Sequence, residues 1–277
     1  MIRFFTAGES HGPGLVIIVE GVPAGLTISE DYIAVQLGRR QKGYGRGGRM
    51  LIEQDWAKIM SGVRHGRTLG SPIGMQIENK DWVNWLEAMA IEYVDNPSQE
   101  GRNQRVTRIR PGHADLPGTM KYGFDDVRNS LERASARETA ARVAAGAVAR
   151  ALLEEFGITL HSHVISIGAV SSAPVESIDW DAVEDSPVRC ADQAAANRMM
   201  LAIDAAKEAG DTVGGTVEIV ADNVPIGLGS HVHWDRKIDG LLSQALMSIN
   251  AVKAVSIGPG WEVIDRPGSE FQDVIEP

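Results

Sequence analysis

Residues 135–157 read SARETAARVAAGAVARALLEEFG, and this stretch decides the fold. Its apolar side chains recur at helical spacing, at Val143, Ala147, Val148, Ala151 and Leu152. Ser135 and Glu138 have the spacing of a capping box, in which each side chain binds the other residue's main-chain N–H. Gly157 can end the helix. The pattern predicts a long, Ala-rich helix that is largely buried.

The segments around this helix predict short antiparallel strands alternating with further helices. Ser29 precedes a capped helix that ends near Arg40, and a Gly-rich loop follows it directly. Strands are predicted at 50–55, 58–63, 71–80, 158–170 and 212–224, and helices at 193–210 and 237–255. Residues 64–70 are predicted to be turn material. We therefore expect an α+β fold with strands on the outside and buried helices between them.

Two distant segments of the chain are alike, VIIVEGVPAGL at 16–26 and VEIVADNVPIGL at 217–228. Each is an apolar strand that runs into Val-Pro-X-Gly-Leu. A match this short can arise by chance, or it can mark a duplicated strand-and-turn unit. Because no low-complexity linker separates the halves, residues 1–277 are predicted to form one domain, and internal duplication stays an open alternative.

The composition is that of an ordinary globular chain, with 277 residues, 43% hydrophobic and 23% charged. The net charge of −10 argues against general nucleic-acid binding, which needs a basic surface. We find no signal segment and no apolar run of about 20 residues, so we expect no membrane span and a cytoplasmic location. Cys190 is the only cysteine, which excludes an internal disulfide. The basic excess lies in residues 1–153, where we expect an anionic ligand.

The opening loop TAGESHGP at 6–13 places Glu9, Ser10 and His11 between glycines and a proline. Adjacent Ser and His side chains point apart in an extended segment, and no G-x-S-x-G elbow is present, so a serine nucleophile is disfavoured. His11 can serve as a general acid or hydrogen-bond donor. The alternative is a capped turn without chemistry, and the residues alone do not decide between them.

The loop at 43–48 matches G-x-G-x-x-G, the dinucleotide fingerprint, but in the wrong context. The fingerprint follows a strand and opens a helix, whereas here a predicted helix comes first and a predicted strand follows. A Rossmann dehydrogenase is therefore a distant hypothesis. The loop presents guanidinium groups that can bind phosphate or carboxylate, and a solvated basic turn is the alternative. Its arginines are Arg39, Arg40, Arg46 and Arg49.

The run at 110–142 contains a histidine, a pair of aspartates and five arginines, a density of charge that packing alone does not require. A Pro-Gly-His loop followed by Arg and Ser near a helix start builds an anion site beside a titrating group. The histidine of this loop, His113, is the candidate titrating group. This run is expected to decide the function.

Three further patterns have weaker functional interpretations. His161 and His163, and likewise His231 and His233, have the spacing of two side chains on one face of a strand, which metals can use. Neither pair has a third ligand nearby, so strand-surface histidines are favoured and no metal is expected. Asn250 lies in a predicted apolar helix, where it can either point at a ligand or be a buried, satisfied amide.

The chain resembles the chorismate synthase family through motifs that run from its first residues almost to its end. The matching segments are GESHGP at 8–13, RRQKGYGRGGRM at 39–50, SGVRHGRTLGSPIG at 61–74, the whole run at 110–150, GDTVGG at 210–215, WDRK at 234–237 and SINAVK at 248–253. They occur in the order found in that family.

The resemblance implies a β-α-β sandwich of antiparallel sheets around buried helices and a homotetramer. It implies that 5-enolpyruvylshikimate-3-phosphate loses its phosphate and a C6 hydrogen by anti-1,4-elimination, giving chorismate in the last common step of the shikimate pathway. Reduced FMN is the implied cofactor, because side chains do not supply an electron donor for such a step. NADPH is the implied ultimate electron source. No reductase segment is visible, so an external flavin reductase is expected as a partner.

Residue roles follow from the resemblance position by position. His11 is expected to protonate the departing phosphate, and His113 to protonate or hydrogen-bond the reduced flavin. The flavin-binding positions are Arg133, Ala134, Ser135, Asn250 and Ala251. The positions expected near the substrate phosphate or NADP are Arg40 and Arg46, with Arg49 and Arg110 as further anion ligands.

The chain departs from the family pattern at its end. It stops at FQDVIEP, before a later Gly-rich flavin segment, a Lys-Pro motif and a terminal Arg/Asp motif. We therefore expect a C-terminally truncated form that binds FMN weakly and turns over slowly. The alternatives are a truncated form that keeps only fold or assembly, and a module that binds anionic metabolites.

Overall fold

The computed structural model describes residues 2–46, 55–175, 177–272, 274 and 275. The chain divides into two compact units, Met1–Asn223 and Val224–Pro277, and each is described here by itself. The described residues form a mixed α+β structure with eight α-helices and three antiparallel sheets. The expected α+β class is therefore confirmed. None of the described helices is both long and apolar enough to cross a membrane.

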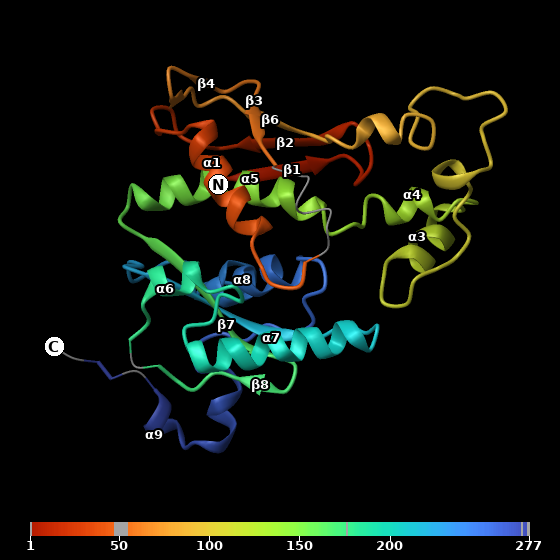
Figure 1. Ribbon diagram of the computed structural model, residues 1–277. Helices are drawn as coiled ribbons and strands as arrows, with labels where there is room; N and C mark the ends of the chain where they lie inside the picture. The colour runs from red at the N-terminus through yellow and green to blue at the C-terminus, as the bar shows by residue number, and fades with distance from the viewer. Residues whose placement is uncertain (1, 47–54, 176, 273, 276–277) are drawn as a thin grey trace. The chain divides into compact units, whose positions relative to one another are not determined.

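The first sheet has the strand order β1-β2-β6-β3 (Figure 1). Its strands are β1 (Arg3–Ala7), β2 (Gly14–Glu20), β3 (Ala57–Ile59) and β6 (Ile73–Glu78). Along β2 the side chains alternate, so that Leu15, Ile17 and Val19 are buried and the residues between them face outward. The buried face packs on helices α1 (Glu30–Gln41) and α5 (Glu138–Glu154).

Helix α5 is the long buried helix that the sequence predicts. Its buried face consists mostly of alanines, which let β2 and α1 approach its backbone closely. The predicted capping box is wrong. The residue before the helix is Arg137, whose backbone is already helical, and the Ser135 hydroxyl accepts from the Arg137 N–H at 3.3 Å. The Glu138 carboxylate instead accepts from Thr6 and Arg142, because the chain enters α5 from a preceding turn and offers no extended N-cap.

Helix α1 begins as predicted, with the Ser29 hydroxyl accepting from the Tyr32 N–H at 3.1 Å. The predicted strand at 58–63 forms as two pieces, β3 and β4 (Val63–Arg64), and the predicted turn after it holds β5 (Arg67–Thr68). The connecting residues His65 and Gly66 have positive φ, as a two-residue hairpin turn requires. The predicted strand at 50–55 lies outside the described residues except for Asp55.

The third sheet has the order β8-β7-β9, with strands β7 (Thr159–Ile167), β8 (Val170–Ser171) and β9 (Gly215–Asp222). Helix α7 (Gln193–Glu208) packs on β7 and β8 and forms a small core around Met199. Helix α6 (Trp180–Asp185) precedes it and is capped by Asp179. The predicted strand and helix of this region are confirmed.

Between β6 and α5 the chain makes a long excursion that extends to the right of the first sheet in Figure 1. It contains two 3-10 turns, η1 (Trp82–Asn84) and η2 (Gly101–Asn103), and the helices α3 (Asp115–Tyr122) and α4 (Arg128–Leu131). A Cβ on Gly118 of α3 would lie 2.5 Å from the Ser130 hydroxyl oxygen of α4. The absence of a side chain at Gly118 thus lets the two helices touch.

The second unit contains η3 (Trp234–Arg236), helix α8 (Ile238–Met247), η4 (Gly260–Asp265) and helix α9 (Gly268–Phe271). The helix predicted at 237–255 is therefore too long, and Asn250 lies in the turn after α8. The Ser248 hydroxyl donates to the Ala245 carbonyl at 2.7 Å, and Ala251 has a φ of 70°. Helix α8 has already ended at Met247, before this left-handed residue.

The two similar segments, 16–26 and 217–228, also have similar backbone conformations at matching positions. Gly21 after β2 has a φ of 82°, and the matching Asn223 after β9 has a φ of 58°. The glycines of the two Val-Pro-X-Gly-Leu segments, Gly25 and Gly227, have φ values of 93° and 98°. The two segments thus share a strand that ends in the same left-handed turns.

Candidate functional site

The loop from Gly8 to Pro13 is fixed to the strands beside it. Gly8 has a φ of 107°, and a Cβ there would lie 2.4 Å from the Gly14 carbonyl oxygen, so only glycine fits. The Asn79 amide donates to the Gly12 carbonyl at 2.8 Å, and the Asn79 N–H donates to the Pro13 carbonyl at 3.0 Å. The loop that carries His11 is therefore held at the end of the first sheet.

His11 is bound by the carboxylate of Glu132, whose side chain is only 1% exposed. The His11 main-chain N–H donates to Glu132 Oε2 at 2.8 Å, and the ring Nδ1 lies 2.9 Å from both carboxylate oxygens. The Ser10 N–H donates to the Glu132 carbonyl at 3.1 Å. One residue thus holds both the main chain and the ring of the loop.

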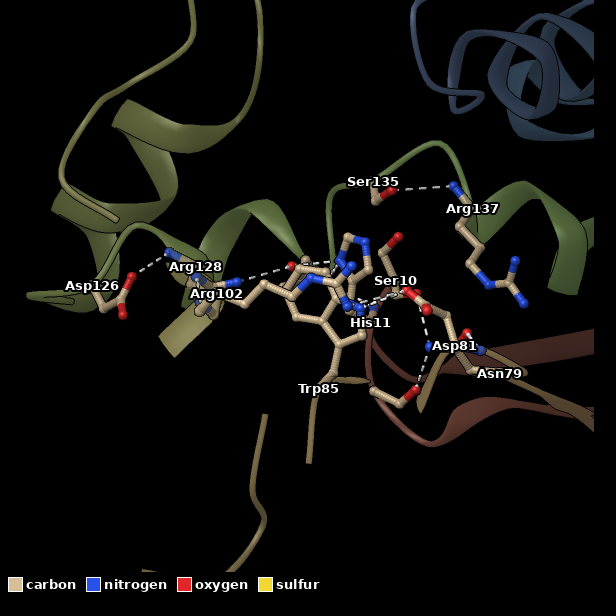
Figure 2. Close-up of polar contacts among 12 residues, drawn as sticks. Ser10, His11, Asn79, Asp81, Trp85, Arg102, Asp126, Arg128, Ser135 and Arg137 are labelled. Atoms are coloured by element: carbon tan, nitrogen blue, oxygen red, sulfur yellow. Dashed lines mark hydrogen bonds and ion pairs between the residues drawn. The ribbon is translucent and has the colours of Figure 1, made fainter. Parts of the chain in front are cut away.

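The indole of Trp85 stacks on the His11 ring, with centroids 3.8 Å apart and an angle of 26° between the planes (Figure 2). Its Nε1–H donates to Asp81 at 2.7 Å. The guanidinium groups of Arg102 and Arg128 lie 5.1 and 5.5 Å from the indole centroid. Carboxylate, imidazole, indole and guanidinium groups therefore lie together, with Arg102 3.9 Å from Asp81 and Arg128 3.8 Å from Glu132.

The second histidine, His113, has a carboxylate of its own. Its Nδ1 lies 2.5 Å from Asp115 Oδ1, and the Asp115 side chain is fully buried. The Arg110 guanidinium beside Asp115 lowers the pKa of that carboxyl to about 2. Asp115 in turn raises the pKa of Arg110, with a smaller contribution from the negative charge of Glu132. Asp115, which binds His113, and Glu132, which binds His11, thus both raise the pKa of Arg110.

The residues Arg133, Ala134 and Ser135 lie where α4 passes into α5. The Arg133 guanidinium donates to the main-chain carbonyls of Thr6 at 2.7 Å and Gly8 at 3.2 Å. The Ala134 N–H donates to the Ser130 carbonyl at 3.2 Å. Through these bonds Arg133 joins the triplet to the segment that leads into the His11 loop.

The last turn of α1 and the loop after it contribute a second set of guanidinium groups. Arg40 donates to Thr139 at 2.9 Å and to the Ala136 carbonyl at 3.0 Å. Ala136 directly follows the Arg133–Ser135 triplet in the sequence. Arg46 donates to the Arg40 carbonyl, which folds the loop back on α1. The Arg39 guanidinium is paired with Glu184 instead, at 2.6 Å. Arg49 lies outside the described residues.

No contact described here joins the other predicted positions to this cluster. Asn250 and Ala251 belong to the second unit, whose placement relative to His11 is not described. His161 stacks on Trp180 with ring centroids 4.5 Å apart, and His163 binds Glu218 at 2.7 Å. Within the part of the chain that the structure describes, no three His, Cys, Asp or Glu side chains gather where they could hold a metal ion.

The family model for chorismate synthase matches residues 2–276. The chain belongs to the chorismate synthase family. It is 56% identical over 281 residues to a chorismate synthase of Geobacillus sp. (strain WCH70), covering 99% of this chain and 71% of that protein. With the Bacillus subtilis (strain 168) chorismate synthase it shares 52% identity over 278 residues, with the same coverage. A solved chorismate synthase crystal structure superposes with a TM-score of 0.81 at 43% identity, over 99% of this chain and 74% of that one.

Membership assigns the activity. The chain is a lyase that converts 5-enolpyruvylshikimate-3-phosphate to chorismate in the shikimate pathway of aromatic amino acid biosynthesis. Its substrate is a phosphorylated small molecule, and the chorismate synthase family uses reduced FMN.

The sequence does not predict three residues that contact the histidines, namely Glu132, Trp85 and Asp115. Glu132 is 121 positions from its partner His11, so no spacing rule joins them. Trp85 stacks on His11 from a distant part of the sequence, so no local pattern joins the two rings. Asp115 gave a local signal, because an acidic residue two positions after a loop histidine is within reach of Nδ1.

Proposed function

We propose that His11 donates the proton to the departing phosphate and that His113 is the proton donor or hydrogen-bond partner facing the reduced flavin. The observation that supports these roles is shared by both residues. Each histidine binds a buried carboxylate through Nδ1, Glu132 in one case and Asp115 in the other. A carboxylate on one ring nitrogen directs proton exchange to the other nitrogen, as general acid–base chemistry requires.

For the cofactor we propose reduced FMN bound beside His113, with NADPH as the ultimate electron source and an external flavin reductase. Reduced FMN supplies the electron density that cleavage of the C–O and C–H bonds needs. The chemistry of the donor set fits this group, because Arg110 and His113 offer N–H donors to an anion while a fully buried Asp115 orients both. The residues that would hold the flavin are Arg133, Ala134, Ser135, Asn250 and Ala251.

For the substrate phosphate or NADP we propose Arg40, Arg46, Arg49 and Arg110. Arg40 supports this assignment because its side chain is largely buried and its guanidinium donates to residues at the start of α5. A guanidinium that is already oriented loses little conformational entropy when it binds an anion. Anti-1,4-elimination is the proposed course of the reaction.

For the architecture we propose a single β-α-β sandwich domain, internally duplicated. Helix α5 contacts β1 and β2 of the first sheet and β7 of the third, which suits a middle layer. The equal φ signs at Gly21 and Asn223, and at Gly25 and Gly227, suit a duplicated unit. A cytoplasmic location stays a prediction.

For the assembly we propose a homotetramer. The outward face of the first sheet carries Phe5, Val16 and Ile18, which are 60%, 47% and 42% exposed, and Phe5 pairs with Ile18 across β1 and β2. Three large apolar side chains side by side on a sheet are typical of an interface. We propose that this face packs against the same face of a second copy of the chain.

The histidine roles are tested with His11→Ala and His113→Ala, assayed anaerobically for chorismate with reduced FMN supplied. Each should lower kcat by about 10²–10⁴-fold, the contribution of a positioned acid or base. The control is His231→Ala, an exposed histidine of the second unit, which should keep full activity. Turnover within twofold of the unmodified chain in His11→Ala, with an unchanged melting temperature, would refute the phosphate role.

A further inference from the structure

We propose that Glu132 is the positioning residue of His11: it keeps one ring hydrogen on Nδ1, so that the imidazolium gives its transferred proton from Nε2 and the neutral ring left behind carries its hydrogen on Nδ1. The proposal rests on the proposed role of His11 as proton donor. Glu132 itself is assigned no contact with the substrate or the flavin.

The first argument is the number of contacts on one carboxylate. Glu132 accepts from the His11 N–H at 2.8 Å and binds Nδ1 at 2.9 Å through both oxygens. An ionised carboxylate has only acceptors, so the ring nitrogen facing it carries a hydrogen. The main-chain contact fixes the position of the His11 backbone, and the ring contact fixes which ring nitrogen carries the hydrogen.

The second argument is that the ring cannot turn away from this carboxylate without losing its stacking on Trp85, at 3.8 Å between centroids. Arg128 connects the two supports, because its guanidinium lies 3.8 Å from Glu132 and 5.5 Å from the indole centroid. Both Arg128 and Glu132 are almost fully buried, so the guanidinium is a close countercharge for the carboxylate that holds the ring.

The third argument concerns the residue type. Glutamine has the same shape, but only one of its two terminal atoms is an acceptor, whereas Oε1 and Oε2 of Glu132 both lie 2.9 Å from Nδ1 and Oε2 also accepts from the main-chain N–H. With its oxygen on the main chain, its NH₂ faces Nδ1 and moves the ring proton to Nε2. Aspartate keeps the charge and both acceptors but is shorter by one methylene group.

The test compares Glu132→Gln and Glu132→Asp with Glu154→Gln, a matched change at the far end of α5, where Glu154 accepts from the Tyr32 hydroxyl at 2.8 Å. Glu132→Gln should lower kcat about 100-fold while KM for the substrate stays within about threefold. Glu132→Asp should recover part of this loss, and Glu154→Gln should show none.

The direct readout is the ¹⁵N spectrum of the histidine rings, with the His11 signals assigned by their loss in His11→Ala. In the unmodified chain the neutral ring should carry its proton on Nδ1, and in Glu132→Gln on Nε2. A proton on Nε2 in the unmodified chain would overturn the proposal even if the variants fail to fold. An unchanged tautomer, or kcat within twofold of the unmodified chain, in a folded Glu132→Gln would also overturn it. If His11→Ala stays active, the proton-donor role fails instead, and the tautomer still decides the positioning role.

Discussion

Asp115 accepts hydrogen bonds from both the main-chain N–H and the guanidinium Nε of Arg110, at 3.1 and 2.9 Å, and its side chain is fully buried. The chain doubles back over five residues to make this pair, and His113 lies within the bend. The loop therefore contains its own ion pair, and its geometry depends on the charge of Asp115.

This pair predicts a loss of stability in acid. The pKa of Asp115 is lowered to about 2 by Arg110, from an ordinary value of 3.8. A carboxyl with a depressed folded-state pKa stabilises the fold above its unfolded pKa, and this contribution disappears as the pH falls from about 4 to about 2. The contribution is about 2 kcal/mol.

The measurement is the free energy of unfolding between pH 6 and pH 2 in the unmodified chain and in Asp115→Asn. The variant should lose less stability over the range from pH 4 to pH 2. Asp125→Asn, which removes an aspartate that is 94% exposed, is the control and should leave the curve unchanged. Parallel curves for the unmodified chain and Asp115→Asn would contradict the prediction.

Removing the Trp85 indole that stacks on His11 should lower kcat/KM by less than removing the histidine itself. Trp85→Ala loses a stacked ring pair worth about 0.5–1.5 kcal/mol, which corresponds to roughly two- to tenfold in kcat/KM if the ring then moves. Trp85→Phe keeps a ring that can stack and should recover most of this loss. Steady-state assays of both variants decide it, and equal losses in the two would show that the Nε1–H bond to Asp81 matters more than the stacking.

Adding one methyl group at Gly8 should disrupt the His11 loop. Gly8→Ala places a Cβ 2.4 Å from the Gly14 carbonyl oxygen at a φ of 107°, so both a clash and backbone strain of about 1–3 kcal/mol oppose it. Gly25→Ala is the matched control, with a φ of 93° and no atom within 4 Å of the added Cβ. Thermal unfolding should show the larger loss for Gly8→Ala, together with a loss of turnover. Equal melting temperatures in the two variants would argue against the close approach.

A charge on the outer face of the first sheet should weaken the proposed assembly. Ile18→Lys places an ammonium among Phe5 and Val16, and burying an unpaired charge in an interface is costly. Sedimentation velocity should show a smaller species for this variant. Leu201→Lys, at a residue of α7 that is 69% exposed, should sediment like the unmodified chain. An unchanged sedimentation coefficient in Ile18→Lys would place the interface elsewhere.

Local patterns were enough to predict much of the fold. The buried face of α5, the Ser29 cap of α1 and the strands β6, β7 and β9 follow from periodicity and caps that lie within a few residues of each other. Other local predictions were wrong. Ser135 does not cap α5 because Arg137, the residue before the helix, already has a helical backbone. The strand predicted at 58–63 forms as two pieces, and α8 ends at Met247, so that Asn250 lies in the turn after it.

The sequence by itself determined the family and the reaction and gave the two loop histidines as candidates, because these inferences depend on residue types in an ordered series of short motifs. Only the tertiary structure decided what the histidines bind. Glu132 and Trp85 reach His11 from positions 121 and 74 residues away, through the packing of α4 and η1 around the first sheet. Periodicity describes which face of an element is buried, whereas the partner of a side chain across the fold depends on how separate elements pack.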